Sequence, residues 1–328
     1  MKNNNYQQLT RTFQRLSRFS HLSSIASWDM FTMMPPGGSA ARGEALAEMS
    51  VLQHQILTDK KVGEWLAAAA DEDLNDVELA NLREMTRHYQ QATLLPESLV
   101  EAKSLAGSRC EHAWRTQRPA NDWQGFSANL KEVVKLSREE ARLRAEAKGC
   151  TPYDALLDIF EPDMTSARLD VLFGELKSWL PELLAKVVEK QAQRSFVPPQ
   201  GPFPTATQRE LGLEAMKMLG FDFNGGRLDV SAHPFCGGVP EDVRITTRYD
   251  EDELLSALFG VIHETGHARY EQNLPRSWAG QPVALARSTA IHESQSLFFE
   301  MQLGRSDAFL KHLLPAVHAR FGSQAAFS

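Results

Sequence analysis

Cysteine is scarce in this chain, and its few cysteines form no recognisable pattern. The 328 residues include three, at Cys110, Cys150 and Cys236, without pairing or CxxC spacing. Such thiols are expected to be free, in a reducing compartment. The simplest expected location is the cytoplasm.

Long apolar runs, a basic excess and sequence repeats are also missing. No segment approaches the roughly 20 apolar residues of a membrane span, and residues 1–8 lack the apolar core of a signal peptide. The net charge of −7 argues against a nucleic-acid partner. With 42% hydrophobic and 23% charged residues, the composition is that of an ordinary globular protein.

Helical periodicity dominates what is present. It predicts helices at residues 6–26, 40–57, 76–92, 96–115, 122–148, 165–193 (with a kink or break at Pro181) and 205–219. In the helix at 122–148, four residues are expected on the inner side: Leu130, Val133, Val134 and Leu136. Only residues 227–249 favour strands, because apolar and polar residues alternate from Val243 to Tyr249. After Ser306 the sequence offers no sign of a completed fold.

The stretch His263-Glu264-Thr265-Gly266-His267 carries the clearest chemistry. It lies in a predicted helix at residues 250–273, where Asp250 and Glu253 resemble a capping box. On a helix the two histidines are one turn apart on one face, so both imidazoles can reach one metal ion. Glu264 is rotated by about 100° from His263. It is therefore expected to reach a water on the metal as a general base, as in metal-assisted peptide hydrolysis.

Gly266 is unusual inside this helix. Glycine costs roughly 1 kcal/mol relative to alanine in a helix interior. Its presence predicts that another part of the chain packs close to the helix backbone at this position.

A catalytic zinc site needs a third protein ligand, and Glu293 is the leading candidate. It lies in a second predicted helix at residues 288–300, and two His with one Glu leave one position open for water. Glu293 could instead be a surface salt-bridge carboxylate. His292 and Glu300 are lower-ranked alternatives, whereas a third His downstream of the motif is excluded because Tyr270 and Asn273 occupy the relevant positions.

Several motifs along the chain resemble those of one family. They are Ser27-Trp28-Asp29, Met34-Pro35-Pro36-Gly37-Gly38 with Ala41-Arg42, His233-Pro234-Phe235 (HPF), Asp242-Val243-Arg244-Ile245-Thr246 (DxRxT), HETGH itself, and His292-Glu293-Ser294-Gln295. Together they resemble the thermostable carboxypeptidase family of zinc metallopeptidases, the Taq carboxypeptidase type, up to about Arg305.

The resemblance implies a fold and a set of roles. It implies a mainly α, large helical zincin-like fold with a small β-ribbon beside the zinc helix, and it makes Glu293 the third zinc ligand. The expected organisation is one domain, residues 1–328, with an N-terminal helical part at 1–200 and a zinc-site part at 201–328. The family's GxxQDxHW and IRxxAD motifs do not occur here, so a C-terminally truncated form is expected. Family members are commonly homodimers, which makes a homodimer one expected state.

Two further residues are candidates for substrate binding. His233 could support the oxyanion, although a His before Pro in a loop is often structural. Arg244 could orient substrate or pair with Asp242 or Asp250. The strand that contains Arg244 could line the substrate cleft, or serve as a structural ribbon. Trp28 and Asp29 are expected to serve helix packing and capping. Candidates for supporting the imidazoles are Asp252, Ser288 and Ser296.

Three functional hypotheses follow. The first is a zinc carboxypeptidase that releases C-terminal residues from peptides, with Glu264 as general base. The second is a zinc endo-oligopeptidase, because HExxH with a downstream Glu is shared by that group. The third is a truncated pseudoenzyme that retains metal binding. The expected cofactor is zinc, with cobalt or another divalent metal as alternatives.

Overall fold

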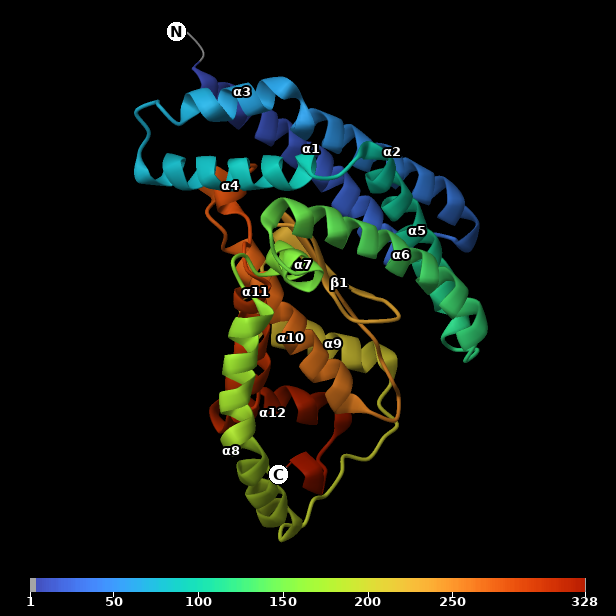
Figure 1. Ribbon diagram of the computed structural model, residues 1–328. Helices are drawn as coiled ribbons and strands as arrows, with labels where there is room; N and C mark the ends of the chain where they lie inside the picture. Colours follow the sequence, from blue (N-terminus) through green and yellow to red (C-terminus); the bar gives the residue numbers. More distant parts are fainter. Residues whose placement is uncertain (1–3, 328) are drawn as a thin grey trace. The chain divides into compact units, whose positions relative to one another are not determined.

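Most of the chain is helical, and its strands form one small sheet. The computed structural model describes residues 4–327. The α-helices are α1 (Asn5–Thr32), α2 (Ser39–Thr58), α3 (Lys60–Ala69), α4 (Asp76–Thr93), α5 (Glu97–Gln117), α6 (Trp123–Lys148), α7 (Pro152–Phe160), α8 (Ser166–Ala192), α9 (Thr205–Met218), α10 (Leu254–Gln272), α11 (Thr289–Leu297) and α12 (Asp307–Phe321) (Figure 1). The strands β1 (Gly226–Val230), β2 (Cys236–Val239) and β3 (Asp242–Thr247) form a sheet in the order β1-β3-β2. The predicted mainly α fold with a small β-ribbon is confirmed.

The chain divides into two compact units that alternate along the sequence. The first comprises the chain up to Ala155 with Gly237–Arg244 and Glu271–Ala286. The second comprises Leu156–Cys236, Ile245–Tyr270 and Arg287–Ser328. The division at residue 200 and the single domain stay predictions.

The first unit is built around α1, α3 and α4. Its core contains Leu9, Phe13, Val62 and Met85, all nearly inaccessible to solvent. Asn81 of α4 is also buried: its amide nitrogen donates to Tyr6 Oη at 3.1 Å and to Gln281 Oε1 at 3.2 Å. A buried amide with satisfied hydrogen bonds secures the loop at residues 281–283 to this helical core.

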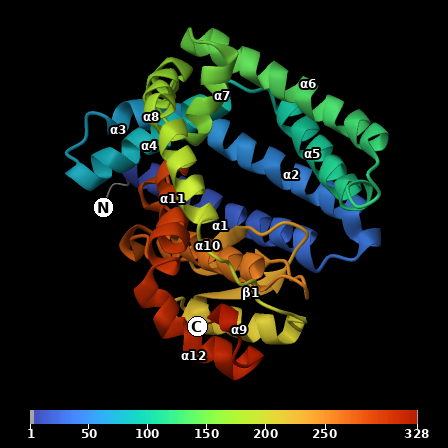
Figure 2. The same ribbon diagram turned by 90° about the horizontal axis from the view of Figure 1, so that it is seen from below.

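The second unit is built around α9, α10 and α12, which share one apolar core (Figure 2). Leu211 of α9, Ile262 of α10 and Leu313 of α12 are each at most 2% exposed. This core buries the side of α10 that carries Leu254, Leu258 and Ile262, and it thereby determines which face of α10 remains available for the histidines.

Several elements differ from the sequence predictions. α3, α7 and α12 were not predicted, and α12 places Leu313 and Val317 in the core of the second unit. α8 runs through Pro181 without a break. None of the helices in residues 4–327 is long and apolar enough to cross a membrane.

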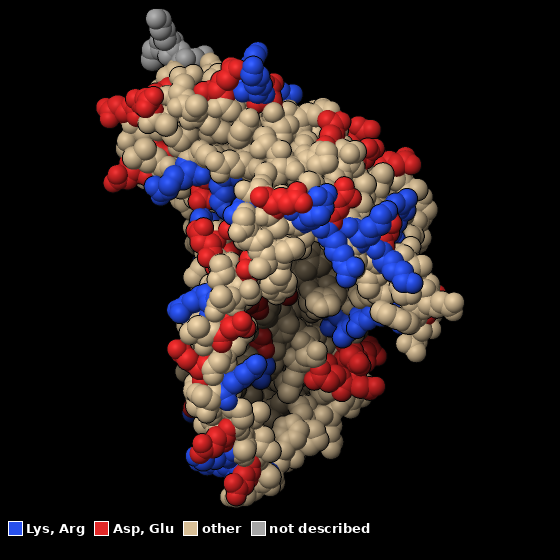
Figure 3. Space-filling model, viewed as in Figure 1, with Lys and Arg blue, Asp and Glu red and all other residues tan. Residues whose placement is uncertain are grey.

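Helix α8 stands apart because none of its 27 residues is buried. Its N-terminus is capped by Thr165, whose side chain accepts a hydrogen bond from Arg168 N. Its exposed large apolar side chains are Val171, Phe173, Leu176, Trp179, Leu180, Leu183, Leu184, Val187 and Val188. The surface is hollowed to the right of α8, so no packed layer covers the helix there (Figure 3).

Candidate metal centre

Helix α10 carries the HETGH stretch in its second half. It begins at Leu254 rather than at Asp250, and Glu253 caps it by accepting a hydrogen bond from Ser256 N at 2.9 Å. Asp250 accepts one from Asp252 N at 2.9 Å, within the preceding turn. The predicted capping box is therefore wrong, because Asp250 stabilises this turn and the first free N–H groups of the helix lie farther along the chain.

Three side chains meet at one point of the second unit. Nε2 of His263 lies 3.6 Å from Oε1 of Glu293, and Nε2 of His267 lies 3.4 Å from Oε2 of the same carboxylate. One ligand atom from each of the three residues lies within 4.8 Å of the other two. In a tetrahedral site with metal–ligand bonds of about 2.0–2.1 Å, neighbouring ligand atoms are about 3.3 Å apart. The donor set and spacing therefore fit a divalent metal such as zinc.

Gly266 explains how α11 comes close enough to contribute Glu293. A Cβ at Gly266 would lie 2.7 Å from Gln295 O and 2.7 Å from Ser296 Cα, both backbone atoms of α11. Such distances are too short for any side chain. The prediction that another segment packs against the backbone at Gly266 is confirmed, and the segment is the helix that carries the third member of the cluster.

Glu300 contacts the far side of one histidine. Its Oε2 lies 3.0 Å from Nδ1 of His263, and its Oε1 accepts a hydrogen bond from Arg305 at 2.7 Å. The predicted helix at 288–300 ends at Leu297, and Glu300 lies in a π-helix, Phe298–Gly304. Although burial raises the pKa of Glu300, hydrogen bonds from Arg305 and His263 outweigh it and lower the pKa overall. An ionised carboxylate only accepts, so Nδ1 of His263 donates in this contact, and Nε2 is the ring nitrogen that faces Glu293.

Sequence reasoning missed this role of Glu300. It ranked Glu300 as an alternative ligand and proposed Asp252, Ser288 and Ser296 as supports for the imidazoles. Asp252 is exposed, and the Ser296 hydroxyl donates to the backbone oxygen of Glu293 at 2.7 Å. His292, the other lower-ranked ligand, stacks on the His267 ring at 4.6 Å between centroids. The one sequence signal for Glu300 was its place seven residues after Glu293, about two helical turns along the same stretch. Its contact with His263, which lies on another helix, could not be deduced from that spacing.

Burial sets the protonation of the two innermost groups. Glu264 is 7% exposed, and burial followed by the nearby Glu293 carboxylate raises its pKa to about 8. Burial, reinforced by His292 and His263, lowers the pKa of His267 to about 4. A neutral imidazole is the form that binds a metal ion, so His267 is ready to act as a ligand at neutral pH.

The two predicted substrate residues have different surroundings. His233 is exposed, with Nδ1 2.8 Å from the oxygen of Pro234. The guanidinium of Arg244 is held by Asp242 through two hydrogen bonds of 2.9 and 2.6 Å and lies over the Trp28 ring at 4.6 Å. Of the alternatives for Arg244, pairing with Asp242 is therefore the one observed.

Thr246, the last residue of the DxRxT stretch, makes hydrogen bonds to the HPF stretch. Its hydroxyl accepts a hydrogen bond from Phe235 N at 3.0 Å and lies 2.7 Å from Ser231 Oγ. Its backbone N donates to Phe235 O at 2.9 Å. These contacts hold the loop that carries His233 onto β3.

Asp29, which lies in the first unit, was expected to cap a helix. Its side chain instead pairs with Arg42 at 2.8 Å.

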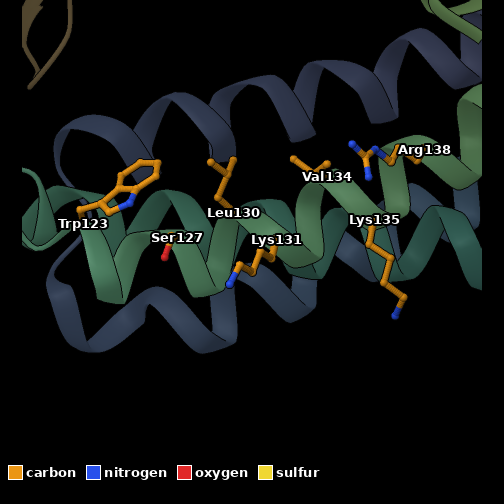
Figure 4. Close-up of a pocket in the computed structure, with 7 residues that line it drawn as sticks. All are labelled: Trp123, Ser127, Leu130, Lys131, Val134, Lys135 and Arg138. Carbon is orange, nitrogen blue, oxygen red and sulfur yellow. The ribbon is translucent and has the colours of Figure 1, made fainter.

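A groove along α6 in the first unit is of a different kind. It is lined by Trp123, Ser127, Leu130, Lys131, Val134, Lys135 and Arg138. Trp123, Leu130 and Val134 point to one side of the helix, and Lys135 points to the other (Figure 4). Val134 is 38% exposed, so its predicted place on the inner side is wrong, whereas Leu136 is buried. None of the lining residues is a His, Cys, Asp or Glu, and the groove offers no metal-binding group.

Comparison with known proteins agrees with the site. The chain is 38% identical to thermostable carboxypeptidase 1 of Thermus thermophilus over 331 residues, which cover 97% of this chain and 65% of that protein. It is 35% identical to carboxypeptidase 1 of Bacillus subtilis, covering 90% of this chain and 59% of the relative. The solved structure of Trypanosoma cruzi metallocarboxypeptidase 1 superposes with a TM-score of 0.89 at 49% identity, covering 99% of this chain and 66% of the other.

The chain therefore spans somewhat less than two thirds of the length of these relatives. The family model for carboxypeptidase Taq (M32) metallopeptidases matches residues 8–327, almost all of the chain. This chain belongs to the carboxypeptidase Taq (M32) metallopeptidase family.

Proposed function

We propose that this chain carries the catalytic centre of a zinc-dependent metallocarboxypeptidase that releases C-terminal residues from peptides. The observation that supports it most is the convergence of His263, His267 and Glu293 at distances that suit a divalent ion. Its relatives are named as carboxypeptidases, which supports the proposal that cleavage takes place at the C-terminal end of the peptide.

In this proposal, His263, His267 and Glu293 hold the metal. Two nitrogens and one carboxylate oxygen are the donor set of catalytic zinc sites, and cobalt would be accepted by the same set. When bound, the metal acts as a Lewis acid that acidifies water and polarises a carbonyl group. The Glu300 carboxylate keeps His263 in the tautomer that this role requires.

Glu264 is the proposed general base. It takes a proton from the attacking water and delivers it to the leaving amine after the peptide bond breaks. Burial and Glu293 raise its pKa to about 8. A nearby cation favours the ionised carboxylate, so metal binding would return Glu264 to its basic form at neutral pH.

His233 is the better of the two predicted substrate residues. Its ring is exposed and is carried on a loop that Thr246 holds to β3. We therefore propose that His233 contacts the peptide during the reaction. Arg244 is held by two hydrogen bonds to Asp242 within β3 and lies over the Trp28 ring, so a structural role is better supported.

Location and assembly follow the same expectations. The three cysteines are free, which supports a reducing compartment, and we propose the cytoplasm. Peptides are the proposed substrates, and a homodimer stays a prediction that sedimentation of the purified chain would test.

Hydrolysis of N-blocked peptides tests the function. Peptides with free and with amidated C-termini would be incubated with the chain in the presence of Zn²⁺ or Co²⁺. Release of C-terminal amino acids from the free peptides alone is the expected result. Internal cleavage of amidated peptides would indicate an endo-oligopeptidase instead, and bound metal without turnover would indicate a pseudoenzyme.

The substitution Glu264→Gln sharpens this test. General acid–base catalysis contributes about 10²–10⁴-fold to rates, so activity should fall at least about a hundredfold while metal content stays unchanged. Glu175→Gln on the exposed surface of α8 is the matched control and should keep full activity. Undiminished turnover by the Glu264→Gln protein would show that another group is the base.

A further inference from the structure

The position of Glu293 depends on a short helix. α11 has nine residues, and Glu293 is the fifth of them. Gly266 allows α11 to approach α10 closely. At its C-terminal end α11 continues into the π-helix, whose Phe299 and Leu303 pack against the core of the second unit. A contact at the N-terminal end would determine the axial position and rotation of α11 at its other end.

Glu161 provides such a contact at the N-terminus of α11. This residue follows α7, and its backbone N donates to Leu157 O at 2.8 Å. Its two carboxylate oxygens lie 2.7 and 2.8 Å from the Ser288 hydroxyl, which donates to them, and Oε2 also accepts from Ala290 N at 2.9 Å. Ser288 in turn accepts a hydrogen bond from Ile291 N at 3.1 Å. One carboxylate and one hydroxyl together satisfy two N–H groups of the first turn.

The charge of Glu161 suits this place. The N-terminus of a helix carries a partial positive charge, so a carboxylate there is stabilising. Glu161 precedes Ser288 by 127 positions and Ala290 by 129 positions in the sequence. The contact is therefore a tertiary attachment and not a local cap. Glu161 and α11 both belong to the second unit.

From these contacts we propose that Glu161 is a positioning residue for the metal centre. It acts through α11: Glu293 is the third residue after Ala290, a rise of about 4.5 Å along the helix axis, so a shift of the first turn is passed directly to the Glu293 carboxylate. The proposal rests on the proposed function, because it assigns Glu293 to the metal.

The metal affinity of variants tests it without reference to catalysis. Co²⁺ would be titrated into the metal-free protein in competition with a chelator, and the visible absorption of the Co²⁺ protein would report the ligand geometry. In Glu161→Ala, affinity should fall about ten- to a hundredfold, the usual effect of losing a group that orients a ligand, and the spectrum should change. Glu161→Gln keeps one acceptor oxygen for Ala290 N and should recover part of the loss.

Asp163→Asn is the matched control in the same loop. The Asp163 side chain is 89% exposed and lies 3.8 Å from Arg287, a weak surface pair. Its backbone has a φ of 68°, which asparagine tolerates. This variant loses a negative charge only two residues from Glu161, yet it should bind Co²⁺ with wild-type affinity and spectrum.

The outcomes separate this proposal from the function. Wild-type affinity and spectrum in a folded Glu161→Ala protein would overturn it. If that variant does not fold by circular dichroism, Glu161→Asp decides, because it keeps the charge but withdraws the carboxylate by one methylene; wild-type affinity there would overturn the proposal as well. Failure of the unaltered protein to bind Co²⁺ would instead overturn the proposed metal centre itself.

Discussion

Helices α10 and α8 both belong mainly to the second unit, and both are rich in apolar residues, but they differ completely in burial. α10 has nine buried residues among its 19. α8 has none among its 27, although large apolar side chains recur along its length. Apolar content therefore does not determine burial, because a helix is buried only where neighbouring elements cover it.

The difference is reflected in the chemistry of the two helices. The neighbours of α10 bury Glu264, and burial is the first cause of its raised pKa. They also bring Glu293 and Glu300 within reach of His263. α8 presents ion pairs to solvent, such as Lys186 with Glu182 at 2.5 Å. Exposed pairs of this kind contribute little to the free energy of unfolding. The candidate metal-binding groups thus meet beside the covered helix α10.

The largest expected difference between the two helices is in how much a leucine-to-alanine substitution lowers the free energy of unfolding. Leu258 of α10 is 6% exposed within the core, and Leu184 of α8 is 58% exposed. Leu258→Ala should lower the free energy of unfolding by about 2–5 kcal/mol, because it leaves a cavity. The same substitution at Leu184 should change it by less than about 0.5 kcal/mol. Urea unfolding monitored by circular dichroism measures both, and equal losses would contradict the comparison.

The next effect concerns the contact between α10 and α11. In Gly266→Ala the new Cβ would meet α11 backbone atoms at 2.7 Å, so α11 must move and take Glu293 with it. Affinity for Zn²⁺ or Co²⁺ should fall about ten- to a hundredfold, or about 1.4–2.7 kcal/mol. Gly260→Ala in the same helix is the control, because its nearest neighbour would be Thr247 Oγ1 at 3.9 Å. Metal binding that is equally strong in both variants would show that α11 is not held by this contact.

The smallest effect on the free energy of unfolding is expected from substitutions on the exposed face of α8. These substitutions should change the solubility of the protein instead. The exposed apolar side chains of α8 form a surface that is prone to self-association, and we expect the purified chain to aggregate. Leu184→Glu should reduce aggregation measured by light scattering, with a change in unfolding free energy within about 0.5 kcal/mol. Gln191→Glu adds the same charge to α8 without removing an apolar group and should help less. A monodisperse wild-type chain would argue against this prediction.

Local patterns predicted a good part of the fold and of the site. Helical periodicity located α1, α2, α4, α5, α6, α8 and α9 to within a few residues, except that α1 extends to Thr32. A glycine inside the HETGH helix indicated a close neighbour, which is α11. Such predictions succeed because they depend on residues within a few turns of one another.

Other features escaped prediction because they depend on distant residues. α12 interrupts its apolar pattern with Pro315, yet it is held by the core of α9 and α10. The π-helix that brings Glu300 to His263 has no distinct periodicity of its own. Val134 fits the apolar side of α6 by spacing but lines an open groove.

By itself the sequence determined the chemistry that this protein can offer: two imidazoles one turn apart, a carboxylate beside them, and a later Glu as a third candidate. Tertiary structure decided which carboxylate faces both imidazoles, which one orients His263, and that Glu161 holds the start of α11. The physical reason is that spacing along a helix is set by local geometry. The distance between separate helices, in contrast, is set by side-chain packing over the whole unit.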